Sequence, residues 1–277
     1  MTALLAMKID TIVTDMDDTL FNEEGRISDY TLDVVKECLN RNIRFIPASG
    51  RAQPSMEPYM KLLKTGMPYI ACNGAQLVNA DHSLMEGLAM SAELTRQICG
   101  FWLENRCHTQ VYHGSCFYYA KECRHSEGYK RSSGMMGIEV GDLVSFVTFD
   151  TPKLLGIGEP RLIAELFERS KKEFGDAAIF SISKPTYLEV APKGGTKGDA
   201  LRRLGARIGI NPQNTLVFGD SLNDLSMLGF SENSVAVGNA RDEVKHAARY
   251  TCLPNGQDGP ARFVREHVFG RIPKEKK

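Results

Sequence analysis

The sequence predicts an α/β fold in which a parallel sheet with crossover helices is interrupted by an inserted second domain. Apolar strand patterns alternate with helical patterns over residues 8–82, which is typical of a parallel sheet. Polar residues follow directly after several of these strands, at the edge where such sheets bind their ligands. A different pattern occupies residues 84–187, and the first pattern then resumes.

The first part of the chain alternates between strands and helices. A β-branched run with Ile12 and Val13 ends at Asp15 and predicts the first buried strand. Ser28 is a suitable N-cap for the helix that follows. The other elements expected here are a helix at 28–42, a strand at 43–48, a helix at 55–63 and a strand at 69–71.

Residues 84–187 contain a different mixture of elements, without polar residues at successive strand ends. The expected elements are helices at 91–105 and 160–174 and strands at 109–112, 116–119, 153–157 and 178–183. The polar, glycine-rich stretch 122–142 has no clear period, so no element is expected there. We interpret this part as an antiparallel sheet with helices, inserted into the first domain.

The first pattern resumes near residue 187. The expected elements are strands at 187–190, 215–218 and 234–237, a glycine-rich loop at 192–199, a helix at 200–208 and a short helix with Met227 and Leu228. The basic tail after Pro273 is expected to be disordered. Residues 1–83 and 188–277 are therefore predicted to form one domain around the insertion.

The composition argues against two classes of protein. The 277 residues include 34 Lys and Arg and 34 Asp and Glu, so the net charge is zero, whereas general nucleic-acid binders are usually basic. No apolar run approaches the roughly 20 residues that span a bilayer, so no membrane span is expected. The seven cysteines are irregularly spaced, which favours reduced thiols in a cytoplasmic protein over a disulfide framework.

A cluster of carboxylates follows the first predicted strand. Asp15, Asp17 and Asp18 lie within four residues, and carboxylates this close repel one another unless a cation shares them. Asp220 and Asp224 place further carboxylates after a later strand. Because a hard divalent ion such as Mg2+ prefers oxygen ligands, we expect these side chains to form an acidic Mg2+ pocket at one sheet edge.

Three further residues suit a phosphate group. Ser49 supplies a hydroxyl, Gly50 lets the backbone approach a ligand closely, and Lys197 supplies a cation. The spacing of Asp15 and Asp17 suggests that one carboxylate attacks phosphorus while the other acts as general acid and base. The residue pattern alone leaves open which carboxylate has which role.

Four motifs resemble those of the haloacid dehalogenase-type phosphatases, in the same order and at strand ends. Residues 15–19 (DMDDT) resemble the first motif, DxDxT or DxDxV, although many members carry Gly where this chain has Asp18. Residues 48–51 (ASGR) resemble the second motif, and Lys197 in its glycine-rich loop resembles the third. Residues 219–224 (GDSLND) resemble the fourth, GDxxND.

The large insertion and two short stretches, 73–75 (NGA) and 255–259 (NGQDG), are similar to the Cof-type subgroup of this family. The resemblance implies a Rossmann-like parallel-sheet core, residues 1–83 and 188–277, with an inserted α/β cap at 84–187. It also implies a Mg2+-dependent phosphatase of a small phosphorylated metabolite, such as a sugar phosphate or a phosphorylated vitamin.

The resemblance further implies a role for each matching residue. Asp15 would be the nucleophile that forms an aspartyl-phosphate, and Asp17 the general acid and base. The side chains of Asp15 and Asp220 and the main-chain carbonyl of Asp17 would hold Mg2+, and Asp224 would support that site. The groups implied to hold the phosphoryl group are the backbone of Met16 and Gly50 and the side chains of Ser49, Lys197 and Asn223.

Two other functions are compatible with the motifs. A phosphomutase of the same superfamily would return the phosphoryl group to its substrate and yield a phosphorylated isomer. A non-catalytic sensor would bind a phosphorylated ligand without releasing phosphate. The intact set of Asp15, Asp17, Lys197 and Asp220 favours an enzyme over a sensor.

Several other groups receive a structural interpretation. Arg51 is expected to orient a loop or to contact substrate. The cysteines and histidines between residues 99 and 125 lack the paired spacing of zinc modules and are expected to pack or to lie on the surface. Packing is expected, with substrate contact as the alternative, for Tyr118, Tyr119 and Tyr129. A solvated face is expected, with anion binding as the alternative, for Lys121, Arg124, Lys130 and Arg131.

Overall fold

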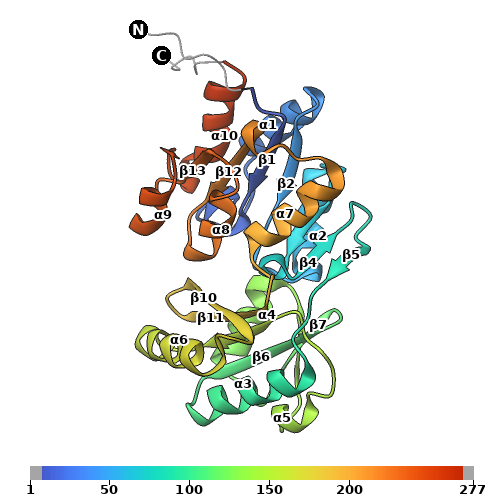
Figure 1. Ribbon diagram of the computed structural model, residues 1–277, viewed down its shortest axis with the longest axis vertical. Helices are drawn as coiled ribbons and strands as arrows, with labels where there is room; N and C mark the ends of the chain where they lie inside the picture. The colour runs from blue at the N-terminus through green and yellow to red at the C-terminus, as the bar shows by residue number, and fades with distance from the viewer. Residues whose placement is uncertain (1–7, 271–277) are drawn as a thin grey trace.

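The computed structural model describes residues 8–270, and Figure 1 shows two units, one above the other. The upper unit contains a five-stranded sheet in the order β14-β13-β12-β1-β2, and the lower unit a six-stranded sheet in the order β10-β11-β9-β6-β7-β8. A third sheet of three short strands has the order β3-β4-β5. The tail after Pro273, predicted to be disordered, lies outside the described residues.

All strand pairs of the five-stranded sheet are parallel, which confirms the predicted fold class. Its strands are β1 (Thr11–Thr14), β2 (Arg44–Pro47), β12 (Thr215–Gly219), β13 (Asn233–Ala236) and β14 (Tyr250–Thr251). Strand β1 lies between β2 and β12, and its four residues are all buried. The residues that follow these three strands are therefore neighbours at one edge of the sheet.

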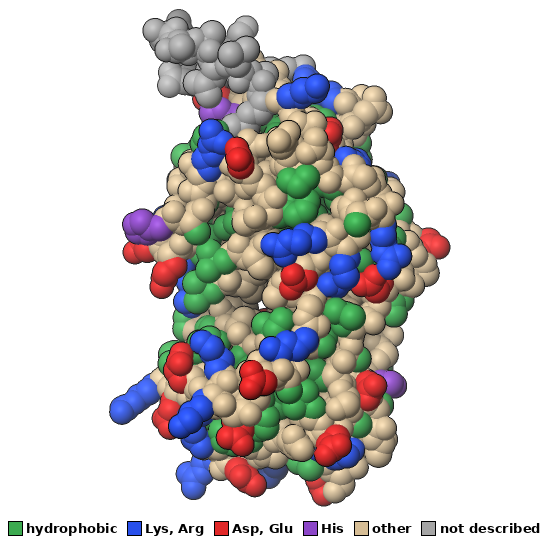
Figure 2. Space-filling model, in the orientation of Figure 1, with side chains coloured by type: hydrophobic (Ala, Val, Ile, Leu, Met, Phe, Trp, Pro, Cys, Tyr) green, Lys and Arg blue, Asp and Glu red, His purple; other side chains and the backbone are tan. Residues whose placement is uncertain are grey.

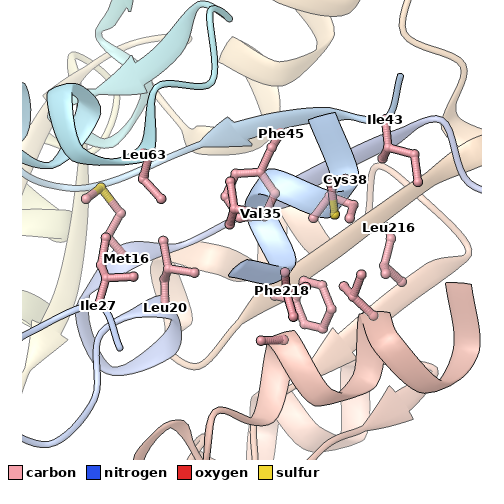
Figure 3. Close-up of a cluster of buried hydrophobic side chains, with 14 of the residues drawn as sticks. Met16, Leu20, Ile27, Val35, Cys38, Ile43, Phe45, Leu63, Leu216 and Phe218 are labelled. Atoms are coloured by element: carbon pink, nitrogen blue, oxygen red, sulfur yellow. The ribbon is translucent and has the colours of Figure 1, made fainter. Parts of the chain in front are cut away.

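Helices cover both faces of this sheet. One face packs against α1 (Asp29–Asn40), α2 (Gln53–Leu63) and α10 (Gly259–Phe263), and the other against α7 (Lys197–Ile208), α8 (Leu225–Leu228) and α9 (Asp242–Ala247). Successive strand residues alternate between the two faces, so that Ile12 belongs to one core and Val13 to the other. Figure 3 shows the first of these cores, where Phe45 of β2 and Phe218 of β12, the strands on either side of β1, lie near Val35 of α1.

The six-stranded sheet is antiparallel except for one parallel pair, β7 with β8. Its strands are β6 (His108–His113), β7 (Cys116–Tyr119), β8 (Met136–Glu139), β9 (Leu154–Ile157), β10 (Ala178–Lys184) and β11 (Tyr187–Pro192). Helices α3 (Ala92–Glu104) and α6 (Pro160–Phe174) share one core with it, and α5 (Leu143–Phe146) closes the end of that core. The residues of its other face, including Tyr112 and Leu155, cluster with Ala52 and Cys72 of the upper unit.

Two expectations from the sequence differ from the structure. The stretch 122–142, for which no element was expected, contains α4 (Arg124–Ser133) and β8. The strand at 187–190 was expected in the parallel sheet, but β11 pairs antiparallel with β9 and β10. The reason is that α4 buries mainly hydroxyl-bearing side chains, which give no apolar period, and that a single strand does not encode its partner.

The third sheet bears on where the insertion begins. Strand β5 (Leu84–Gly87) pairs with β4 (Gln76–Val78), which pairs with β3 (Tyr69–Ala71) of the upper unit. The expected boundaries at 83/84 and 187/188 therefore separate β5 and β11 from their sheets. We propose that the inserted unit runs from 88 to 192; it is called the cap unit below, and the remainder the core unit.

The start of α7 fits closely against α8, and this contact requires a glycine. A Cβ atom on Gly198 would lie 2.1 Å from the carbonyl oxygen of Ser226. We expect Gly198→Ala to lower the free energy of unfolding by about 1–3 kcal/mol, because backbone must move to accept the methyl group. Urea unfolding monitored by circular dichroism measures this loss.

Gly100 of α3 is the matched control for this substitution. A Cβ atom there would meet no atom within 4 Å, so Gly100→Ala should raise stability by up to about 1 kcal/mol through helix propensity. Equal unfolding midpoints for Gly198→Ala and the wild type would contradict the tight packing of α7 on α8.

The surface charges, the apolar length of the helices and the state of the cysteines can be compared with what the composition predicts. On the face drawn in Figure 2, side chains of Lys and Arg are interspersed with those of Asp and Glu. Among residues 8–270, no helix has both the length and the apolar character that a bilayer crossing requires. The seven cysteines are free thiols, and Cys99 and Cys107 lie in the core of the cap unit.

Candidate active site

The carboxyl ends of β1, β2 and β12 bring the predicted motifs together. Asp15 directly follows β1, Ser49 follows β2, and Asp220 follows β12. Because these strands are parallel neighbours, three segments that are far apart in sequence meet at one edge of the sheet. The turn of Met16–Leu20 then carries Asp17 and Asp18 away from the strand, with Asp18 in the left-handed region at φ 59°.

Three buried carboxylates form the centre of the site. One carboxylate oxygen each of Asp15, Asp220 and Asp224 lies within 4.8 Å of the others. Burial, and then the charge of Asp224, raises the pKa of Asp220 to about 6, although hydroxyl groups of Ser221 (2.7 Å) and Thr19 (2.9 Å) donate to it. Burial also raises the pKa of Asp15 well above its usual value. Burial and the neighbouring carboxylates thus disfavour the ionised form of both side chains.

Lys197 compensates part of this charge. Its Nζ atom donates to Oδ1 of Asp15 (2.5 Å) and to Oδ1 of Asp224 (2.6 Å), and the side chain is fully buried. Burial disfavours the ammonium, but the two carboxylates outweigh it and raise the pKa of Lys197. Thr196 places the lysine by capping α7, since its Oγ1 accepts from the N–H of Asp199. Helix α7 thus begins with a cation that contacts two of the three buried carboxylates.

Asp224 is fully engaged by protein groups. Its Oδ2 atom accepts from the N–H groups of Asp220 and Ser221, both at 3.0 Å, while Oδ1 accepts from Lys197. A Cβ atom on Gly219 would lie 2.6 Å from that of Asp224, so the packing requires glycine there. Asp224 therefore holds the turn after β12 in place. Asp15 accepts from Lys197 through Oδ1 only, and each oxygen of Asp220 accepts a single hydroxyl, so both carboxylates keep lone pairs for a ligand.

The donor set fits a hard divalent cation such as Mg2+. Three carboxylates and one lysine leave an excess of negative charge, and oxygen is the ligand type that Mg2+ prefers. Asn223 adds a buried Oδ1 atom that has no partner among the described residues. An unpaired buried acceptor is costly, which is a sign of a site that binds a ligand.

Asp17 does not belong to this group of three carboxylates and instead forms an ion pair with Arg51. The Nε and Nη2 atoms of Arg51 donate to its two carboxylate oxygens at 2.7 and 2.8 Å. Burial alone would raise the pKa of Asp17, but these hydrogen bonds and the guanidinium charge outweigh it and lower the pKa. Arg51 also donates to Ser55 Oγ (3.1 Å) and to the carbonyl of Ser132 in the cap unit (3.3 Å).

The groups expected to hold phosphate lie around Asp15. Ser49 is buried, and its Oγ accepts from the N–H of Arg51 (3.1 Å). Gly50 and Asn223 line the cavity next to Asp15. The side chain of Met16 lies in the core, as Figure 3 shows, so only its backbone remains for a ligand.

A cavity of about 130 Å³ lies over these residues, between the core unit and the cap unit. The core unit contributes Asp15, Asp17, Gly50, Arg51, Asp220 and Asn223, and the cap unit contributes Tyr129, Lys153, Leu155, Ser183, Tyr187 and Glu189. Of the three tyrosines considered from sequence, only Tyr129 lines this cavity, while Tyr118 packs on Phe146 and Tyr119 donates to Glu122.

The four basic residues considered from sequence, Lys121, Arg124, Lys130 and Arg131, do not line the cavity. Lys130 pairs with Glu122 at 2.5 Å and Arg124 with Glu159 at 2.8 Å, and neither lines the cavity.

Sequence reasoning missed Asn73, Lys153 and Glu189 as site residues. Asn73 was noted only as part of a turn, and Lys153 was read only as the start of a strand. The one available signal was Glu189, which stands between Leu188 and Val190 in an otherwise apolar strand. A charge in such a position is rarely buried without a partner.

The chain is similar to known proteins along most of its length. Residues 12–264 match the family model described as haloacid dehalogenase-like hydrolase. A 5-amino-6-(5-phospho-D-ribitylamino)uracil phosphatase of Bacillus subtilis is 27% identical over 264 residues, which cover 94% of this chain and 96% of that protein.

Solved structures agree with this match. The crystal structure of a haloacid dehalogenase-like hydrolase from Bacteroides thetaiotaomicron has a TM-score of 0.83 and 25% identity, covering 93% of this chain and 99% of that chain. A Thermotoga maritima protein of known crystal structure has a TM-score of 0.78 and 30% identity, covering 96% and 98% of the two chains.

Proposed function

Because the chain belongs to the haloacid dehalogenase-like hydrolases, we propose that it releases phosphate from a small phosphorylated metabolite through an aspartyl-phosphate, with Mg2+ as cofactor. That it is a phosphoric monoester hydrolase follows from the family and its relatives. The observation that carries the finer proposal is the meeting of Asp15, Asp220 and Lys197 under a small, covered cavity that Asp17 also lines.

In the first step Asp15 attacks phosphorus and forms the aspartyl-phosphate. Lys197 holds the attacking carboxylate in place through its 2.5 Å contact with Oδ1. Mg2+, held by the side chains of Asp15 and Asp220 and the carbonyl of Asp17, would neutralise charge on the phosphoryl oxygens. Backbone groups of Met16 and Gly50 and the side chains of Ser49 and Asn223 hold the phosphoryl group.

Asp17 moves the protons in both steps. It donates a proton to the oxygen of the leaving group, and it then accepts a proton from the water that attacks the aspartyl-phosphate. The contact with Arg51 lowers the pKa of Asp17 and so favours the carboxylate form that activates water. For the first step, Asp17 must exchange Arg51 for the substrate oxygen.

The cavity supports a small substrate. Its volume is about 130 Å³, and the cap unit covers it with Tyr129, Tyr187 and the Lys153–Glu189 pair. A relative named for a phosphorylated ribityl compound acts on a molecule of this class. A sugar phosphate or a phosphorylated vitamin is therefore the class to test first.

The test is phosphate release from a panel of small phosphomonoesters, with Mg2+ and with EDTA. Metal-dependent release of free phosphate is the expected result. A phosphorylated isomer in place of free phosphate would identify a mutase. Binding of a phosphorylated compound by folded, Mg2+-loaded protein without any phosphate release would identify a sensor.

Replacing Asp17 tests the proton transfers separately from nucleophilic attack. In Asp17→Asn, turnover of alkyl phosphates should fall by roughly 10²–10⁴-fold, since their leaving oxygen needs a proton. Nitrophenolate leaves without one, so p-nitrophenyl phosphate should give a burst of one nitrophenolate per enzyme followed by slow turnover. Equal losses for both substrates, with no burst, would remove Asp17 from this role.

A further inference from the structure

The cap unit contains a buried ion pair next to Gly50 in the lining of the cavity. Lys153 precedes β9, and Glu189 lies in the middle of the neighbouring strand β11, opposite Leu155. The Nζ atom of Lys153 is 3.0 Å from Oε2 of Glu189, and the two side chains are only 4% and 6% exposed. Both residues line the cavity.

The stability of the cap unit does not account for this pair. Removing two charges from water costs several kcal/mol per ion, and apolar residues of similar size often serve as well or better. Strands β9 and β11 are already joined by their ladder of hydrogen bonds. What the pair provides is a set of contacts with the core unit.

The lysine reaches the backbone of the second motif. Lys153 Nζ donates to the carbonyl oxygen of Gly50 at 2.6 Å. A Cβ atom at position 50 would lie 3.0 Å from Oδ1 of Asn73 and 3.2 Å from Oε2 of Glu189. The absence of a side chain at Gly50 therefore lets the pair approach the loop that is proposed to hold phosphate.

The glutamate reaches the fourth motif through Asn73. Nδ2 of Asn73 donates to Oε2 of Glu189, and Oδ1 of Asn73 accepts from Nδ2 of Asn223 at 2.9 Å. Ser183 holds the other carboxylate oxygen of Glu189 at 2.5 Å. The contacts thus run from Glu189 in the cap unit to Asn223, a proposed phosphate ligand.

Asn73 is fixed so that it can join these residues. It lies in the turn Cys72–Gly74 with φ 56°, a conformation that asparagine adopts more readily than most residues. The next residue, Gly74, packs so closely on the carbonyl of Thr196 that a Cβ atom would lie 2.2 Å from it. The turn is therefore wedged between the second-motif loop and the start of α7.

We propose that Lys153 and Glu189 are positioning residues for the phosphate site. The pair holds Gly50 on one side and, through Asn73, Asn223 on the other, so that these phosphate-binding groups are ordered only while the cap unit covers the core unit. The inference rests on the proposed function, because it assigns Gly50 and Asn223 to phosphate. It makes the cap unit part of the phosphate site as well as its cover.

The test uses the full-length Mg2+-loaded protein and the variants Lys153→Met and Glu189→Gln. Inorganic phosphate is the probe, and its affinity is measured by calorimetry, together with kcat and KM for p-nitrophenyl phosphate and the melting temperature. Each variant should bind phosphate about 10- to 100-fold more weakly, as is usual when a supporting partner of a ligand is lost. Lys130→Met, which breaks an ion pair of the cap unit away from the cavity, should change none of these constants.

A double substitution separates positioning from stability. Lys153→Met with Glu189→Leu removes both charges, so the protein should melt at or above the wild-type temperature and still bind phosphate weakly. Variants that melt earlier but keep wild-type phosphate affinity and kinetics would show a purely structural pair and overturn the proposal.

A double-mutant cycle tests the route through Asn73. Asn223→Ala removes the end of the chain of contacts, so adding Glu189→Gln should reduce phosphate affinity less than Glu189→Gln does alone, with only the loss through Lys153 and Gly50 remaining. Losses of affinity that simply add in the double variant would overturn the proposed route from Glu189 through Asn73 to Asn223. Absence of phosphate release by the wild type would instead count against the proposed function, whereas phosphate affinity still decides whether the pair positions the site.

Discussion

Asp15→Asn is expected to reduce phosphate release by at least about a thousandfold, to the limit of detection. An amide is a poor nucleophile, and removing the covalent nucleophile of other enzymes costs up to about 10⁶-fold in turnover. The fold should survive, because asparagine has nearly the same volume and Lys197 keeps its 2.6 Å contact with Asp224. Loss of one of three crowded carboxylates also removes repulsion.

Asp18→Asn is the matched control for this substitution. Asp18 also lines the cavity, but its side chain is exposed, its charge lies 4.0 Å from Lys184, and asparagine tolerates its φ of 59°. This variant should keep most of the activity. Phosphate release and melting temperature are compared for the two variants. Wild-type turnover by a pure preparation of Asp15→Asn would contradict the assignment of Asp15 as nucleophile.

Mg2+ is expected to stabilise the protein strongly at pH 7.5 and weakly at pH 5. The pKa of Asp220 is raised from 3.8 to about 6 in the folded, metal-free protein. A group with a raised pKa contributes stability at low pH that is lost as the pH rises from the unfolded pKa to the folded one. At about 1.4 kcal/mol per pKa unit, the metal-free protein at pH 7.5 carries a penalty of roughly 3 kcal/mol from this group.

A cation bound by Asp15 and Asp220 removes this penalty, whereas protons compete with it at pH 5. Replacing Asp220 tests whether its carboxylate causes this penalty. Metal-free Asp220→Asn should melt higher than metal-free wild type at pH 7.5, should gain little from Mg2+, and should release no phosphate. Melting curves with and without Mg2+ at the two pH values provide the measurement, and an equal Mg2+ effect at both would contradict this account.

The acidic centre of the site could be predicted because its information is local. Asp15 and Asp220 directly follow a short buried strand and Ser49 comes two residues after another, and parallel neighbouring strands bring such positions to one edge. The sequence also placed the α6 helix at its observed bounds, because residues 160–174 combine an N-terminal proline with a strong apolar stripe. Local patterns of this kind need no knowledge of distant partners.

The contribution of the cap unit could not be predicted because it depends on distant partners. Strand β11 has the same apolar pattern in either sheet, and only its pairing with β9 places Glu189 over Asn73. Helix α4 buries Ser126, Tyr129 and Ser133, a set without the apolar stripe that marks a helix. The role of Arg51 was left open from sequence, since nothing local indicates that its partner is Asp17.

The pairing of charges in the site has a consequence for the order in which ligands enter. When ionised, Asp15, Asp220 and Asp224 contribute three negative charges and Lys197 one positive charge, while Arg51 and Lys153 are matched by Asp17 and Glu189. A phosphate dianion that arrives alone therefore meets two surplus negative charges. A divalent cation cancels those two charges and so removes the repulsion that phosphate would meet. Each ligand therefore raises the affinity of the site for the other, and we expect the metal to bind first.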